Sequence, residues 1–188
     1  LSLCNKNMVK MDTNNDSKAK HDLLLDVCYA AKYEGNSIKT HYPKYDAEYS
    51  SGSGSTMCTM LARSFADIGD IIRGRDLYRR DNKKDKTDKL QEQLKQYFNN
   101  IYDNLEDAAK KHYNGDKNNN YFQLREDWWT ENRETVWKAI TCDAHGTYFR
   151  ATCSDSHRSE TFSQAKDNCR CNGDQVPTYF DYVPQYLR

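Results

Sequence analysis

Hydrophobic positions along this chain recur mainly every three or four residues, which is the period of an amphipathic helix. The clearest repeat predicts a helix over residues 57–73, which Gly74 can close in a left-handed conformation. Its apolar face consists of Leu61, Phe65, Ile68 and Ile72. Two further repeats predict helices over residues 87–112, with Thr87 as N-cap, and over residues 121–140. The last helix has an apolar arc so wide that it must pack against more than one neighbour.

The other segments are less regular. A helix is predicted over residues 20–34, with Gly35 as its left-handed cap. Residues 50–55 are all serine or glycine, which is typical of a flexible loop. Residues 114–120 interrupt the helical pattern, and no regular element is predicted after Cys142. These patterns predict a mostly α-helical bundle with long irregular loops and little strand.

The composition is that of a polar but folded protein. Charged residues make up 30% of the 188 residues, yet 14 Tyr and 3 Trp are too many for a disordered polymer. Tyrosine suits both the boundary of a thin helical core and an adhesive surface. The formal net charge is zero, so no overall field steers the protein toward nucleic acid, and we expect no nucleic-acid partner.

Local charge is uneven, because residues 73–89 carry eight cations against four aspartates. We call residues 73–89 the basic segment. Its cations are Arg73, Arg75, Arg79, Arg80, Lys83, Lys84, Lys86 and Lys89. A solvated loop followed by a helix start would account for this pattern.

Seven cysteines without a Cys-x-x-Cys pair indicate disulfides and an oxidising compartment. The odd number leaves either one partner missing or one thiol free. The alternative is a zinc site, but its ligand spacing would lack the usual short knuckle, so we expect no metal. The four candidate ligands are Cys142, Cys153, Cys169 and Cys171. The chain shows neither a secretory signal nor a long apolar run, and we expect it to be an excerpt from a larger extracellular protein.

Motifs of common enzyme classes are missing from the sequence. It contains no His-Glu-x-x-His, no glycine-rich phosphate loop and no Gly-x-Ser-x-Gly elbow, and its five histidines are scattered. We therefore expect no enzymatic activity and no cofactor. Asp67, Asp70 and Arg133 form another constellation, because all three fall near apolar stripes of helices that must pack together. They either pair with one another or point to water.

Four blocks of sequence, in the same order, resemble the alpha class of the Duffy-binding-like adhesion domains in malarial erythrocyte-surface variant antigens. The first contains Leu23-Leu24-Leu25-Asp26-Val27-Cys28-Tyr29-Ala30-Ala31-Lys32-Tyr33-Glu34-Gly35. The second is Leu61-Ala62-Arg63-Ser64-Phe65-Ala66-Asp67-Ile68-Gly69-Asp70-Ile71-Ile72-Arg73-Gly74-Arg75-Asp76. The third contains Trp128-Trp129, Asn132-Arg133 and Val136-Trp137-Lys138-Ala139-Ile140-Thr141-Cys142. The fourth is Val176-Pro177-Thr178-Tyr179-Phe180-Asp181-Tyr182-Val183-Pro184-Gln185-Tyr186-Leu187-Arg188.

The resemblance implies a disulfide-stapled helical bundle. Residues 1–56 would belong to the first subdomain, residues 57–183 would form the second, and residues 184–188 would begin a third. Because Asp67, Asp70 and Arg133 lie in the two blocks most similar to the family, we favour a structural ion pair between Arg133 and one of the aspartates.

The cysteines of the bundle are expected to form disulfides. Cys58 lies at the start of the first bundle helix and Cys142 lies just past the end of the third, so a Cys58–Cys142 bridge is predicted, as the resemblance also implies. Cys153 can pair with Cys169 or with Cys171. Finally, Cys4 and Cys28 can pair together, or one of them can pair with a cysteine upstream.

The functional implication of the resemblance is adhesion. Such domains are extracellular modules on the surface of the infected red cell. The alpha class is associated with rosetting, through heparan-sulfate-like glycans, blood-group sugars or complement-receptor-type proteins on host erythrocytes, beside adjacent domains of the same protein. The basic segment has the cation density to bind sulfated glycan. The alternative is a structural or antigenic spacer whose neighbours carry the binding.

Overall fold

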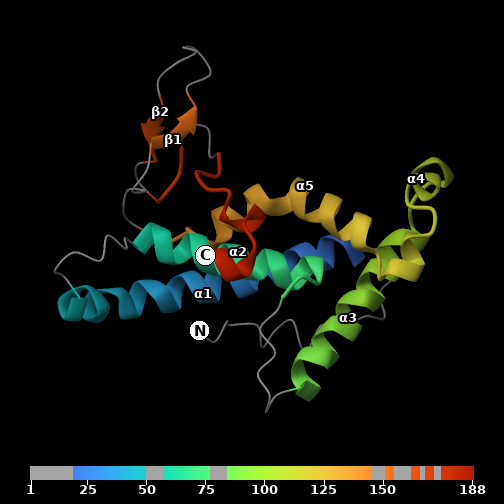
Figure 1. Ribbon diagram of the computed structural model, residues 1–188, viewed down its shortest axis with the longest axis horizontal. Coiled ribbons are helices and arrows are strands. Elements are labelled where there is room, and N and C mark those ends of the chain that lie inside the picture. Colours follow the sequence, from blue (N-terminus) through green and yellow to red (C-terminus); the bar gives the residue numbers. More distant parts are fainter. Residues whose placement is uncertain are drawn as a thin grey trace.

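The computed structural model describes residues 19–49, 57–76, 84–144, 151–154, 162–165, 168–171 and 175–188. Its α-helices are α1 (Ala19–Tyr49), α2 (Met57–Arg73), α3 (Lys84–Asp103), α4 (Asp107–His112) and α5 (Phe122–Ile140). Helices α1, α2 and α5 lie side by side, whereas α3 lies oblique to them and ends beside α4 (Figure 1). This arrangement confirms the predicted fold class of a mostly helical bundle. Within the described residues, no helix is both long and apolar enough to cross a membrane.

The aromatic core lies between α2 and α5. Trp129 and Trp137 are completely buried, and the ring of Phe65 in α2 lies 5.1 Å from each of them, centroid to centroid. On another side of α5, Trp128 meets Phe98 of α3 edge to face at 6.2 Å. The wide apolar arc of this helix therefore packs against more than one neighbour, as predicted, and each aromatic pair adds about 0.5–1.5 kcal/mol beyond its buried area.

The first helix is much longer than predicted. Gly35 does not end it, because α1 continues to Tyr49. A Cβ atom at Gly35 would collide with the backbone carbonyl of Ile140, at the end of α5. The glycine therefore allows two helices to approach closely. The division into subdomains at residues 56 and 57 remains a prediction, but α1 shares one core with α2 and α5.

The single helix predicted over residues 87–112 is two helices. The break follows α3, where the backbone N–H of Leu105 donates to the carbonyl of Tyr102 and the Lys110 ammonium donates to the carbonyl of Asp103. These bonds satisfy carbonyl groups that end a helix. Thr87 is not an N-cap, because α3 already begins at Lys84.

The predicted break between the two long repeats is confirmed, and one buried carboxylate organises it. Residues Asp116–Asn119 form the 3₁₀-helix η3. The two side-chain oxygens of Asp116 accept the backbone N–H groups of Gln123 (3.0 Å) and Leu124 (2.9 Å). A negative charge at this end of α5 satisfies free N–H groups and complements the helix dipole.

One disulfide ties the C-terminal third to the bundle, but it is not the predicted one. Cys58 pairs with Cys169, so the Cys58–Cys142 prediction is wrong. Cys153 pairs with Cys171, which is one of its two predicted partners, so three candidate ligands of the alternative zinc site are engaged in disulfides. The indole N–H of Trp137 donates to the carbonyl of Cys169 (3.2 Å) and so also ties that segment to α5.

Two cysteines in the described part of the chain carry free thiols. Cys142 is exposed, whereas Cys28 is half-buried, and burial raises the pKa of its thiol to about 11. Cys4 lies outside the described residues. No regular element was predicted after Cys142, but the structure has several there. Strands β1 (Ala151–Ser154) and β2 (Phe162–Gln164) pair antiparallel beside the Cys153–Cys171 bridge. Beyond it, the 3₁₀-helices η4 (Phe180–Tyr182) and η5 (Gln185–Leu187) lie over α2 (Figure 1).

Replacement of a core tryptophan should destabilise the protein strongly. We expect Trp137→Ala, and likewise Trp129→Ala, to lower the free energy of unfolding by about 3–5 kcal/mol, because a completely buried ring leaves a cavity. Urea unfolding monitored by circular dichroism measures this loss. The matched control is Tyr33→Ala at an exposed ring of α1, which should change stability by about 0.5 kcal/mol or less. Equal stability of all these variants would mean that the tryptophans are not core residues.

The disulfide pattern can be checked directly. Non-reducing peptide mapping should recover one cross-linked pair that contains Cys58 and Cys169 and another that contains Cys153 and Cys171. Alkylation without reduction should label Cys142, because its thiol is exposed. A peptide pair that joins Cys58 to Cys142 would contradict this pattern.

Candidate functional site

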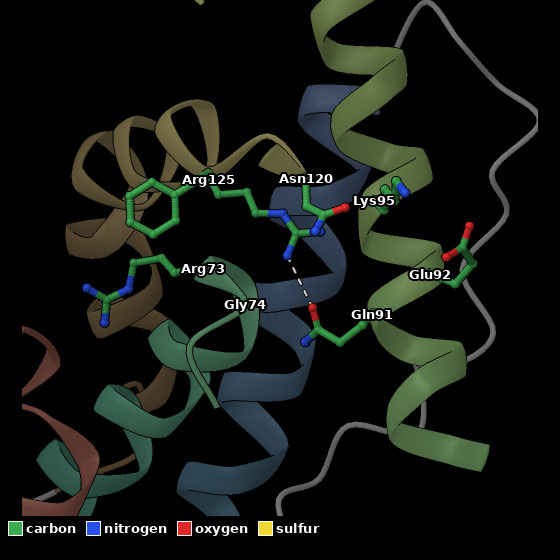
Figure 2. A pocket seen from close by; sticks show the side chains of 8 residues that line it. Arg73, Gly74, Gln91, Glu92, Lys95, Asn120 and Arg125 are labelled. Carbon is green, nitrogen blue, oxygen red and sulfur yellow. Dashed lines mark hydrogen bonds between the residues drawn. The ribbon is translucent and has the colours of Figure 1, made fainter. Parts of the chain in front are cut away.

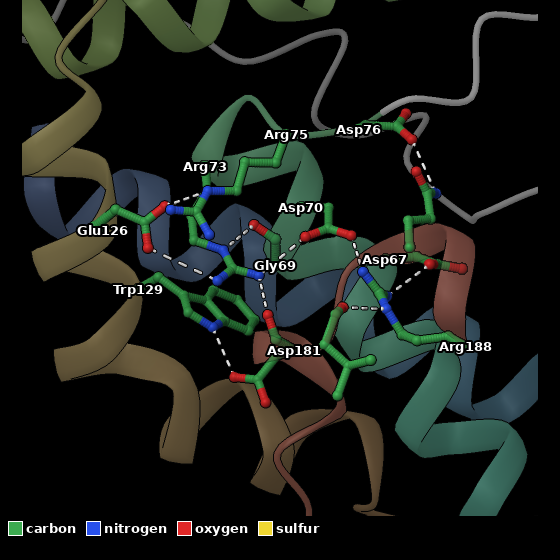
Figure 3. A network of polar contacts seen from close by, with 12 residues as sticks. Asp67, Gly69, Asp70, Arg73, Arg75, Asp76, Glu126, Trp129, Asp181 and Arg188 are labelled. Carbon is green, nitrogen blue, oxygen red and sulfur yellow. Dashed lines mark hydrogen bonds and ion pairs between the residues drawn. The ribbon is translucent and has the colours of Figure 1, made fainter.

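Three charged residues from the sequence analysis, Asp67, Asp70 and Arg133, form ion pairs with the last described segment of the chain. This segment is residues 175–188, and we call it the tail. Arg133 was predicted to bind Asp67 or Asp70, and this partner is wrong. It binds Asp181 of the tail instead, while both predicted aspartates bind Arg188 of the tail. Ion pairs therefore join the helices to the tail, and Figure 3 shows those of Asp67 and Asp70 with Arg188.

The pair between Arg133 and Asp181 is bidentate. The Nε atom of Arg133 donates to Oδ2 of Asp181 at 2.8 Å and its Nη2 atom donates to Oδ1 at 2.9 Å. The Trp129 indole N–H donates to the same Oδ2 at 2.9 Å. Burial is the largest single influence and opposes the charge on Arg133, but the hydrogen bond with Asp181 and the negative charge of Asp181, with smaller contributions from Tyr182 and Tyr179, together outweigh it and raise the pKa of the guanidinium. Its guanidinium also lies 5.6 Å from the centroid of Phe65.

The pair between Arg188 and α2 closes the other end of the tail. The Nη1 atom of Arg188 donates to Oδ1 of Asp67 at 3.0 Å, and its Nη2 atom donates to Asp70. Burial raises the pKa of Asp67 and lowers that of Arg188, while each charge opposes the shift in the other. These are the shifts expected when two ionic groups leave water together.

Arg73 belongs to this structural network and not to a surface for glycans. Only 2% of the residue is exposed, and its side chain donates to the carbonyl of Gly69 (3.0 Å), to Asp70 (3.0 Å) and to the carbonyl of Asp181. Burial lowers its pKa, an effect that Glu126 opposes. The prediction that Arg73 binds glycan is corrected for this reason.

The rest of the basic segment is divided between described and undescribed residues. Arg75 keeps 45% of its side chain exposed, but its Nε atom lies 2.8 Å from a carboxylate oxygen of Glu126. Lys89 is exposed on α3. The side chains of Lys84 and Lys86 are not among those described. Arg79, Arg80 and Lys83 lie outside the described residues.

A cavity of about 450 Å³ opens where α2 ends and where α3 and α5 approach it. We call it the Arg125 pocket (Figure 2). Its lining residues are Arg73, Gly74, Gln91, Glu92, Lys95, Asn120, Phe122 and Arg125. Three cations and one carboxylate thus line it. The guanidinium of Arg73 points away from the other labelled side chains, so Arg125 and Lys95 carry the positive charge of this pocket.

Arg125 is the residue that sequence reasoning missed. It is 4% exposed, its Nη1 atom donates to Oε1 of Gln91 at 3.1 Å, and its guanidinium lies 5.2 Å from the centroid of Phe98. Burial lowers its pKa to about 10, so it stays charged at neutral pH. The sequence does place an arginine beside Leu124 on the apolar arc of α5, which could have predicted a buried charge. It does not indicate which residues of other helices surround that charge.

The described residues contain no metal-binding cluster. Among them, no group of three or more histidine, cysteine, aspartate and glutamate side chains could hold a metal ion. His112 lies exposed, 3.9 Å from Asp127. The cations of the pocket and of the basic segment are the candidates for binding a partner.

The tail should stabilise the bundle through Arg133. We expect Arg133→Ala to lower the free energy of unfolding by about 3–5 kcal/mol, because it leaves the buried Asp181 carboxylate without its cation. A double-mutant cycle on urea unfolding should find coupling between Arg133 and Asp181 and near-additivity between Arg133 and Asp67. The control is Arg63→Ala at an exposed position of α2, which should be nearly neutral. Coupling to Asp67 without coupling to Asp181 would contradict the geometry.

Comparison with known proteins finds similarity along the whole chain. The family model "Duffy binding domain" matches residues 1–188. Among solved structures, the NTS-DBL1(alpha-1) domain of Plasmodium falciparum membrane protein 1 (PfEMP1) from the varO strain is 46% identical, with a TM-score of 0.78. The match covers 98% of this chain and 39% of that one. A search of curated proteins finds no match.

More distant structures share the same fold. The ICAM-1-binding PfEMP1 IT4var13 DBLbeta domain is 32% identical with a TM-score of 0.66, over 96% of this chain and 38% of that one. The same domain bound to ICAM-1 gives 31% identity and a TM-score of 0.60, over 92% of this chain and 38% of that one. The chain thus spans about two fifths of the length of these solved domains.

Proposed function

The chain belongs to the Duffy binding domain family, and from this premise we propose that it is part of an extracellular adhesion module of a malarial variant surface antigen. The module would sit on the surface of the infected red cell and bind host receptors or surface glycans. The observation that carries the proposal is the match to a DBLbeta domain that is solved in complex with ICAM-1, over 92% of this chain. We propose no catalytic role.

Sulfated glycan on host erythrocytes is the partner that the charge pattern favours. The basic segment connects α2 to α3 and contains seven cations once Arg73 is assigned to the interior. Sulfates are fixed negative charges, and clustered Arg and Lys side chains bind such polyanions by releasing their counterions. Arg75 and Lys89 supply exposed charge at the two described ends of this segment. Rosetting through a heparan-sulfate-like chain is therefore the adhesion we propose.

A structural or antigenic spacer is the alternative, and one observation favours it. Glu126 lies near both arginines at the start of the basic segment, 3.7 Å from Arg73 and 2.8 Å from Arg75. This carboxylate neutralises part of the charge that a glycan would need. An exposed pair such as Arg75–Glu126 is worth only about 0–1 kcal/mol, however, so a dense polyanion can displace it. Blood-group sugars and complement-receptor-type proteins are further candidate receptors in this proposal.

Charge reversal in the basic segment tests the glycan proposal. We expect the variant with Arg79, Arg80, Lys83 and Lys84 changed to Glu to elute from immobilised heparin at lower salt. Its retention should also depend less on salt, because fewer counterions are released on binding. The melting temperature should stay near that of the parent.

The matched control reverses four exposed cations elsewhere, with the same change in net charge. These are Lys32, Lys39, Lys111 and Lys117. This control should keep most of the heparin retention. Equal loss in both variants would mean that total charge decides binding, and unchanged retention in the folded test variant would reject the basic segment as the site.

A further inference from the structure

Arg125 differs from the other buried arginines of this protein in its partners. Arg73, Arg133 and Arg188 each pair with an aspartate, through Asp70, Asp181 and Asp67 respectively. Within the part of the chain that the structure describes, Arg125 makes no ion pair, and its Nε atom has no hydrogen-bond partner. The ring of Phe98 and the more distant Asp116 offset only part of the cost of burying this charge. A buried charge without a counter-ion is costly and calls for an explanation.

The surroundings of Arg125 hold its guanidinium at the cavity. Gly74 has a left-handed backbone (φ 71°), and a Cβ atom there would lie 2.9 Å from Nη1 of Arg125, so glycine leaves the space that the guanidinium occupies. Gln91 is fixed as well, because its Nε2 atom donates to the carbonyl of Ile71 at 3.1 Å. Its Oε1 atom is therefore directed to Arg125. The arginine is thus positioned before any ligand arrives.

The other lining residues suit a sugar with a negative group. Lys95 adds an exposed cation, Asn120 adds an exposed amide, and Phe122 keeps 46% of its surface exposed. An amide can bind sugar hydroxyls, and an exposed ring can pack against the C–H face of a sugar. A cavity of about 450 Å³ is larger than a lone ion needs and lies in the range of small-molecule sites.

We propose that the Arg125 pocket binds a single anionic sugar residue of a glycan, and that Arg125 and Lys95 bind its sulfate or carboxylate oxygens. The inference rests on the proposed adhesion to glycans and names the position where one residue of the chain is recognised. The pocket is lined by Gly74 at the end of α2 and by Gln91 on α3, so it lies beside both ends of the basic segment. A glycan that follows the segment can place one charged residue in the pocket.

Monosaccharide binding tests the pocket separately from the segment. The probes are N-acetylglucosamine 6-sulfate, glucuronic acid and neutral N-acetylglucosamine, each titrated into the folded protein and followed by NMR. At least one of the two anionic sugars should bind, and the neutral sugar should not. Binding of the sulfated sugar alone or of the carboxylated sugar alone identifies the group that the pocket selects. Failure of both anionic sugars, or equal binding of the neutral one, would overturn the proposal.

Matched variants assign the binding to the pocket. Lys95→Gln and Arg125→Gln should each lower the affinity for the anionic sugar by about tenfold, because each removes a charge-assisted hydrogen bond. Glu92→Gln should raise this affinity, since the substitution removes the carboxylate that lines the pocket. Lys111→Gln, at an exposed site on α4, should have no effect. The exposed Lys95 and Glu92 keep the test valid if Arg125→Gln does not fold, and unchanged affinity in both would reject the pocket.

The heparin experiment separates this inference from the proposed function. The variant reversed at Arg79, Arg80, Lys83 and Lys84 should lose heparin retention but still bind the anionic monosaccharide. Loss of heparin retention in a protein that binds no monosaccharide would leave the adhesion proposal standing and reject the pocket. Monosaccharide binding that depends on Lys95, in a protein whose heparin retention does not depend on the basic segment, would reject that segment and keep the pocket.

Discussion

Asp181 anchors the tail to the bundle, and the arrangement of the neighbouring side chains depends on it. The carboxylate accepts two hydrogen bonds from Arg133 and one from the indole of Trp129, while its backbone carbonyl accepts one from Arg73. A buried carboxylate with this many donors is strongly held, whereas the loss of one donor leaves charge stranded in the interior. Arg188 then completes the attachment at α2. The tail, α2 and α5 therefore form one unit.

This network also decides which charges remain for binding. A residue such as Arg73, which contacts Asp70 and Glu126 in the interior, cannot bind a receptor without breaking structural pairs. Arg125 is the exception, because no aspartate or glutamate within the described part of the chain pairs with it although it is equally buried. A binding site carried on a fold needs this separation between charges that hold the fold and charges that contact the partner.

Local patterns in the sequence predicted α2 and α5 almost to the residue, because apolar periodicity is a local property. The errors come from contacts between distant residues. Gly35 reads as a cap in the sequence, but the close approach of Ile140 is what requires it. The partner of Arg133 lies 48 residues away, so spacing could not identify Asp181. The same reason explains the wrong disulfide, since Cys169 lies 111 residues from Cys58 in the sequence and spacing could not identify it as the partner.

The Arg125 pocket was beyond sequence reasoning for a related reason. An arginine on an apolar helix face predicts a buried charge. Whether that charge is structural or available to a ligand depends on whether a carboxylate lies opposite it. For Arg133 the tail supplies one, and the pair is structural. For Arg125 the side chain that it hydrogen-bonds is the neutral Gln91, and the cavity lies beside it. Arg125 and Arg133 lie eight positions apart on α5 but have different roles. Arg133 is paired with a carboxylate of the tail, whereas Arg125 faces a pocket that an anion can enter.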